Sequence, residues 1–393
     1  MLNDDTSDRA STEATMSEAT TTAAEPATEK PVEVFIGVAK DQPDHWYGYH
    51  GKADDDQITP YDDAVAHVLE RHLLDGERAD IKVSDLHRWV FGLQDGIAVV
   101  ADPKSGRVVP LRHTAFSHLA ARAKAPPGYL RSIPVRYSLP SLNWGLRHVC
   151  DGSAMIRLAG DEARAIVSQR YAAFDDRVLF PLLRSALVAT DLLDSVEARV
   201  VATGLTTLVR LGVAGDALAI PGTDEIAEVA LDLTNGEVGN RAVGLTPTVY
   251  LRSRGLATRG KGLRLRHLGT PEKLAEEFRD AIPEALANSR KLRDQIAKAV
   301  DRAIEDLVGE AEKLRTFGLS IAEARDVVRQ VAAGSGVDLP HDTAEWEDKI
   351  VAVANVRAYD VFTAIAGLGD TKSIDRRLEL EEAAAKYLAR ATK

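Results

Sequence analysis

The sequence has one cysteine, few aromatic residues and no long apolar run. Cys150 is the single cysteine among 393 residues, which excludes an intrachain disulfide. No apolar run reaches the roughly 18 residues that suggest a membrane-spanning helix, so we expect no membrane partner. The first 30 residues lack the basic-then-apolar pattern of a secretion signal. Together with the lone cysteine, this pattern predicts a cytoplasmic protein.

The sequence also lacks the motifs of common catalytic and metal centres. His67 and His72 are five positions apart, as are His113 and His118, whereas a helical metal-binding pair is spaced by four. There is no HExxH, no paired CxxC and no GxSxG motif. We therefore assign no catalytic residue, no metal and no cofactor, and the sequence favours a non-enzymatic protein over an enzyme.

Charge is segregated along the chain, although the formal net charge is −11. Residues 1–30 contain seven acids and two bases, whereas residues 238–271 contain seven bases and no acid. Such local segregation indicates an anion-binding surface more directly than the net charge does. The seven bases are Arg241, Arg252, Arg254, Arg259, Lys261, Arg264 and Arg266.

Within this basic segment, Gly255 to Lys261 spells the G-x-x-x-x-G-K of a phosphate-binding loop. Such a loop needs Ser or Thr after the lysine, and it must open a helix. Here Gly262 follows, and leucine then alternates with arginine as in a strand with one basic face. A nucleotide site is thereby disfavoured. Two interpretations stay open: a nucleic-acid backbone site, or a solvated hairpin whose cations pair with the chain's own acids.

The periodicity of apolar residues predicts an α+β protein with a central antiparallel sheet, a C-terminal helical bundle and a small N-terminal α/β part. Asn235-Gly236 is the strongest hairpin signal, and Thr270 followed by Pro271 marks the start of the helical region. Asp342 and Glu345 resemble a capping box further along. The predicted segments are a disordered acidic tail (1–30), the N-terminal α/β part (31–150), the central antiparallel sheet with the basic hairpin (151–270) and the helical bundle (271–393).

Three stretches resemble a known family: "MIRLAGDEARAIVSQRYAAFDDRVLFPLL", "LDLTNGEVGNRAVGLTPTVYLRSRGLA" and "LRHLG". Their order is similar to that of the phage- and plasmid-associated family numbered 932 among the domains of unknown function, over about residues 110–390. Where that family has a Cys-Asn-Gly element, this chain reads Ser253-Arg254-Gly255, so no Cys or Asn role is carried over. The matching positions are Arg164, Ser168, Arg170, Tyr171, Asn235, Glu237, Gly239, Arg266, His267 and Gly269.

This resemblance implies a mobile-element protein, a context compatible with DNA metabolism. The expected order of helix, strands and helix is also similar to the core of single-strand annealing recombinases, which bind the phosphate backbone in a basic groove and oligomerise. We therefore predict a non-enzymatic protein that binds and anneals single-stranded nucleic acid through the basic hairpin, and that forms homo-oligomers. The predicted contacts are the seven bases above, His267, Arg170, and Tyr250 and Tyr171 as stacking rings.

Two alternatives remain from the sequence. One is an oligomeric structural or interaction protein without nucleic-acid binding. The other is an enzyme whose site is assembled from Arg164, Arg170, Glu237 and His267. If the acidic tail competes for the basic groove, its deletion would raise the affinity for nucleic acid.

Overall fold

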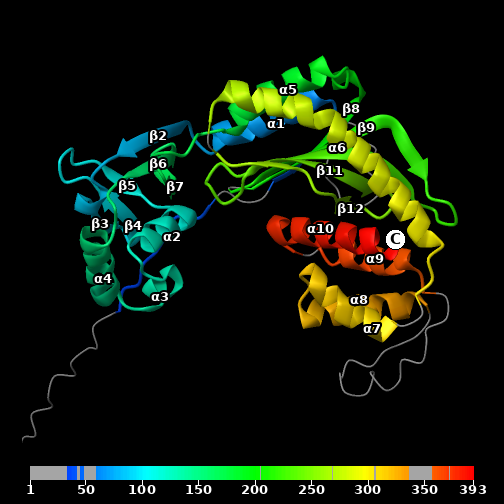
Figure 1. Ribbon diagram of the computed structural model, residues 1–393. Helices are drawn as coiled ribbons and strands as arrows, with labels where there is room; N and C mark the ends of the chain where they lie inside the picture. The colour runs from blue at the N-terminus through cyan, green and yellow to red at the C-terminus, as the bar shows by residue number, and fades with distance from the viewer. Residues whose placement is uncertain are drawn as a thin grey trace, which may run out of the picture.

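The computed structural model describes residues 33–41, 45–47, 59–203, 205–267, 269–304, 307–335, 356–370 and 372–393. The predicted acidic tail and the predicted capping box at Asp342 lie outside the described residues. The predicted α+β class is confirmed: helices accompany sheets in which every pairing between strands is antiparallel. Figure 1 shows two lobes, a small one at the left and a large one at the right.

The large lobe is built on a seven-stranded sheet of order β1-β8-β9-β10-β11-β12, with β13 paired to β11. Its strands alternate apolar and polar residues, and each face is covered by helices, so both faces are buried. The strands are β1 (His45–Tyr47), β8 (Val196–Ala202), β9 (Thr207–Ala219), β10 (Ile226–Asn235), β11 (Val243–Leu251), β12 (Leu256–Arg259) and β13 (Leu263–Leu265).

Helices cover the two faces of this sheet differently. An apolar layer joins one face to α1 (Tyr61–Leu74), α5 (Asp176–Ala189) and the long α6 (Pro271–Val300). The helix α10 (Ile374–Ala391) lies on the other side of the sheet, with α9 beside it (Figure 1). The Thr270 side chain caps α6, and Ser320 with Glu323 forms a capping box. The remaining C-terminal helices are α7 (Leu307–Leu314), α8 (Ile321–Gly334) and α9 (Ala358–Gly367).

The small lobe has two three-stranded sheets, β2-β6-β7 and β3-β4-β5, joined by a bridge between Leu111 and Ala163. Its helices pack on these sheets around a separate apolar core. The strands are β2 (Arg78–Val83), β3 (Val90–Gln94), β4 (Ile97–Ala101), β5 (Val108–Pro110), β6 (Ala154–Ala159) and β7 (Glu162–Val167). The helices are α2 (His113–Arg122), α3 (Pro127–Ser132) and α4 (Val135–His148).

The lobes do not follow the segment boundaries expected from sequence. The β6–β7 hairpin pairs with β2 in the small lobe, not with the large sheet, although the sequence assigns it to the central sheet. Conversely, β1 pairs with β8, and α1 packs on the large sheet. The chain therefore passes between the lobes three times: after residue 41, between α1 and β2, and between β7 and α5.

Candidate functional site

The basic segment 238–271 does not present a free cationic ribbon. Five of its seven cations pair with carboxylates of other segments, which agrees with the second interpretation of the sequence, and the predicted phosphate contacts of these five are not free. Among the described residues, Lys261 and Arg266 have no carboxylate within 4.0 Å. The paired cations are Arg241 with Asp375 (2.5 Å), Arg252 with Glu228 (3.2 Å), Arg254 with Glu225 (3.8 Å), Arg259 with Asp232 (3.0 Å) and Arg264 with Glu382 (2.5 Å).

Two predicted contacts of the hairpin are buried. Arg259 is 2% exposed and Tyr250 is 4% exposed. The guanidinium carbons of Arg199 and Arg210 lie 4.8 and 5.5 Å from the centroid of the Tyr250 ring. The prediction that Tyr250 offers a ring for base stacking is therefore wrong. The segment after Lys261 forms β13 and not a helix, as the sequence pattern indicated.

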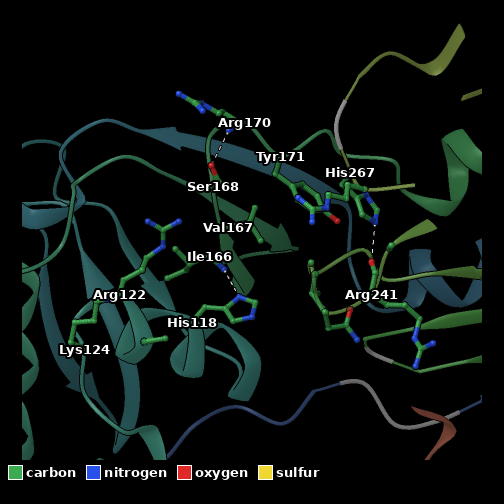
Figure 2. A pocket seen from close by; sticks show the side chains of 16 residues that line it. His118, Arg122, Lys124, Ile166, Val167, Ser168, Arg170, Tyr171, Arg241 and His267 are labelled. Carbon is green, nitrogen blue, oxygen red and sulfur yellow. Dashed lines mark hydrogen bonds between the residues drawn. The ribbon is translucent and has the colours of Figure 1, made fainter. Parts of the chain in front are cut away.

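A basic hollow lies instead between the two lobes, and Figure 2 shows it from close by. Its volume is about 750 Å³. The end of α2, the end of β7 with the loop after it, the turn between β10 and β11, and the residues after β13 all contribute to its wall. Five cations and two histidines line it without any Asp or Glu. These residues are Arg122, Lys124, Arg170, Arg241, Arg266, His118 and His267.

Three cations of this basic hollow are exposed and unpaired. Lys124, Arg170 and Arg266 have no carboxylate within 4.0 Å among the described residues. The other two are paired, Arg122 with Asp151 at 3.2 Å and Arg241 with Asp375. Unpaired cations crowded into one concavity raise the local positive potential and attract anions.

Lys124 holds an unfavourable backbone conformation at the rim of the basic hollow. It follows the C-terminus of α2 with φ of +57°, a region that glycine adopts more readily. A lysine at this position costs conformational energy and adds a cation to the wall. The left-handed conformation is the usual way for a helix to end, so its relevance here is that glycine can replace this lysine without strain.

Tyr171 and His267 are brought together but do not form an open stacking platform. Their rings stack with centroids 4.6 Å apart, and the guanidinium carbon of Arg157 lies 5.3 Å from the Tyr171 centroid. The ring nitrogens of His267 lie 3.2 Å from the carbonyl oxygens of Ala172 and Arg241, and burial lowers the pKa of this imidazole. The stacked rings of Tyr171 and His267 form part of the wall of the basic hollow. The predicted role of these two residues in contacting bases is not supported.

Behind the basic hollow, a buried ionic joint connects the lobes. Arg157 on β6 donates to Asp175 (2.5 Å) at the start of α5 and to the carbonyl oxygen of Glu237. Arg164 on β7 donates to the carboxylate of Glu237, whose other oxygen accepts from the backbone N–H of Asp176 (2.8 Å). Glu237 lies in the turn that follows Asn235-Gly236, so this turn caps α5 and closes the joint.

The joint also contains the group of described residues that best resembles a metal site. One ligand atom from each of His72, Asp176 and Glu237 lies within 4.8 Å of the others. However, the two nitrogens of His72 face different carboxylates, Nε2 toward Asp176 (3.5 Å) and Nδ1 toward Glu237 (3.8 Å). The carboxylates also accept from Asn235, Thr207 and Arg164. The protein's own donors therefore satisfy this group.

Asp176 should make the stability of the protein fall as the pH rises. Burial, followed by the charge of Glu237, raises the pKa of Asp176 to about 6 from an ordinary 3.8. Between about pH 4 and pH 6 the folded state therefore holds a proton that the unfolded state has released, so the free energy of unfolding declines with pH. In Asp176→Asn this decline should be absent.

The free energy of unfolding is measured by urea titration at pH 4, 5, 6 and 7 for the wild type and for Asp176→Asn. Carboxyl groups away from the joint contribute equally to both curves, so the difference between them reports Asp176 together with its partners Glu237 and His72. Parallel curves would show that Asp176 titrates normally in the folded protein.

The residues of the alternative enzyme site do not converge. Arg164 and Glu237 form an ion pair, whereas the ring nitrogens of His267 contact backbone carbonyls and Arg170 is exposed. No ion pair or hydrogen bond joins Glu237 to His267 in the described part of the chain. The arrangement therefore offers no acid–base pair of the kind that the alternative requires.

Arg122 and Lys124, at the end of α2, are not among the predicted contacts, although the sequence carries a signal for them. Residues 103–150 contain no Asp or Glu. This stretch is longer than the basic segment 238–271 and carries more cations. Its eight cations are Lys104, Arg107, Arg112, Arg122, Lys124, Arg131, Arg136 and Arg147.

Comparison of the chain with family models, with curated proteins and with solved structures finds no match. None of the described helices is both long enough and apolar enough to cross a membrane.

Proposed function

We propose that this chain binds single-stranded nucleic acid, and that the basic hollow holds the phosphate backbone. The observation that carries the proposal is a concave wall with five cations and no acid in a chain of net charge −11. Each phosphate that such a wall neutralises releases counterions, and this release favours binding. The resemblance to a phage- and plasmid-associated family is compatible with this function, and membership of that family is part of the proposal.

The inner surface of the basic hollow suits a nucleotide better than a simple inorganic anion. More of its accessible lining is contributed by apolar atoms than by polar atoms. A binding site with an apolar surface and a few polar groups can hold the flat base while the cations hold the phosphate. Arg170 and Arg266 come from opposite sides of the junction, so a bound strand would contact both lobes.

The salt dependence of binding tests this proposal. In electrophoretic or anisotropy titrations with a short oligonucleotide, log K should fall linearly with log salt concentration. Arg170→Ala and Arg266→Ala should each reduce the slope by about 0.7, the value for one phosphate contact with a single strand. Arg264→Ala is the matched control, because this arginine of the basic segment is 66% exposed but pairs with Glu382 of α10 and does not line the hollow.

Lys124→Gly is a third variant of the hollow, and we expect it to fold as the wild type does. Glycine favours the backbone conformation of this position, so the variant should be at least as stable as the wild type while binding more weakly. Binding that is absent, or equal in the wild type and all three hollow variants, would contradict the proposal. In that case the alternative of an oligomeric interaction protein would be preferred.

A further inference from the structure

Three large aromatic rings are exposed on the small lobe. Tyr129 on α3 is 60% exposed, and Tyr137 and Trp144 on α4 are 55% and 61% exposed. Apolar rings of this size are normally well buried in a protein with so few aromatics. On α4, Tyr137, Ser141, Trp144 and His148 repeat with helical spacing along one face, and we call this face the aromatic stripe after its three rings, those of Tyr137, Trp144 and His148.

The opposite face of α4 explains why the aromatic stripe is not part of the core. Ser138, Leu142 and Leu146 are fully buried. Leu142 and Leu146 belong to the apolar core of the small lobe, so α4 is already anchored by that side. Folding of the lobe therefore does not require the aromatic stripe to be covered.

The charge around the aromatic stripe is complementary to a polyanion. Arg136 and Arg147 are exposed beside it, and it lies in the acid-free stretch 103–150. Arg136 lies 4.9 Å from the Tyr137 ring centroid and also pairs with Glu33 at 2.9 Å, while the His148 ring lies 5.1 Å from that of Trp144. Cations interleaved with exposed rings are the arrangement by which proteins stack the bases of a single strand.

The helix that carries the aromatic stripe packs against the end of α2, which contributes to the basic hollow. Gly145, next to Trp144, packs so tightly on the end of α2 that a Cβ there would lie 2.4 Å from the carbonyl oxygen of Ala123. The following residue, Lys124, lines the basic hollow. The end of the hollow at Lys124 is therefore near the C-terminal half of α4, where Asp151 is the exposed acid and pairs with Arg122.

We propose that the aromatic stripe of α4, centred on Trp144 and Tyr137, stacks the bases of the strand whose phosphates the basic hollow holds. This inference rests on the proposed function and adds to it a second element, which recognises bases and not charge. The occupant is single-stranded nucleic acid. A second copy of the chain docking on these rings is the outcome that the experiment must exclude.

The experiment compares two fluorescent strands of equal length, an oligo(dT) and one in which abasic sites replace most bases. Both carry the same phosphates, but only the first can stack. Trp144→Ala should bind oligo(dT) roughly five- to hundredfold more weakly, the range for one base–aromatic contact, with an unchanged salt slope. The abasic strand should bind the wild type and the variant equally.

Leu73→Ala is the control, because this side chain is 75% exposed on α1, away from the aromatic stripe. Equal affinity of the wild type and Trp144→Ala for oligo(dT), while Lys124→Gly weakens it, would overturn the inference and leave the proposed function intact. No binding by the wild type would overturn both. A Trp144→Ala variant that dissociates into smaller species in analytical ultracentrifugation would identify the stripe as an interface between copies.

Discussion

Asp232→Asn should lower the free energy of unfolding by about 3–5 kcal/mol, the range for breaking a buried ion pair. Asp232 is fully buried on β10, between Arg210 of the adjacent strand β9 and Arg259 of β12, the strand beyond β11. Arg210 contacts it through two hydrogen bonds of 2.8 Å each, and Arg259 lies 3.0 Å from its carboxylate. Burial alone would raise the pKa of Asp232, but Arg210 and Arg259 hold it below its ordinary value.

The loss of stability is expected to be large because Asp232→Asn removes the carboxylate that balances the buried guanidinium groups of Arg210 and Arg259. Glu381 on α10 accepts from Arg210 at 3.1 Å, but it also pairs with Arg377 at 3.3 Å. The cluster fixes α10 on the sheet, so the cost should appear in the cooperative unfolding of the large lobe.

Urea-induced unfolding followed by circular dichroism provides the measurement. Asp216→Asn is a matched control: Asp216 also lies between two arginines, Arg290 (2.6 Å) and Arg293 (2.7 Å), but near the surface. We expect this control to cost about 1 kcal/mol or less. Equal destabilisation by the two substitutions would show that burial of the cluster contributes nothing.

Arg157→Met should be comparably destabilising, by about 3–5 kcal/mol, and the loss should be located between the lobes. The Arg157 side chain is fully buried and connects β6 to Asp175 and to the turn at Glu237. Asp80 also accepts from it at 3.1 Å. Methionine retains much of the volume but leaves Asp175 with only the longer contact to Arg164 at 3.4 Å.

Hydrogen exchange separates this effect from general unfolding. Amides of β6, β7 and the turn after β10 should exchange faster in Arg157→Met, whereas those of α8 and α9 should change less. Arg184→Met is the control, because Arg184 makes an equally well-aligned pair with Asp62 (2.8 and 2.9 Å) at the surface, for which we expect a cost under about 1 kcal/mol. A uniform increase in exchange over the whole chain would contradict a joint between the lobes.

Local patterns in the sequence predicted the elements of the fold well. Thr270 followed by Pro271 marks the start of α6, and the alternation of leucine and arginine after Lys261 marks β13, because these signals act within a few residues. The assignment of β6–β7 to the large sheet failed for a different reason. Strand pairing with β2 depends on contacts between residues about 75 positions apart, and no local pattern encodes it.

The candidate site was predicted in part. Arg170, Arg241, Arg266 and His267 do line one hollow, and the resemblance pointed to three of these four positions. Arg259 and Arg264 were misjudged because a list of charges along the chain does not reveal their partners. Those partners are Asp232 and Glu382, and Glu382 lies on the last helix, more than a hundred residues away. Arg122 and Lys124 at the end of α2 are absent from the predicted site because that prediction was based on the shorter acid-free segment 238–271.

The threefold passage of the chain between the lobes has a consequence for how this architecture can be divided. The small lobe is not built from one continuous segment. After residue 41 the chain leaves it to form β1 and α1 of the large lobe, and it returns at β2. A single proteolytic nick in any one connection leaves the halves tethered by the others. Exchange of the small lobe with that of a related protein therefore requires matched junctions at α1–β2 and β7–α5, together with the segment 33–41. The two lobes therefore cannot be separated by cutting the chain at one place.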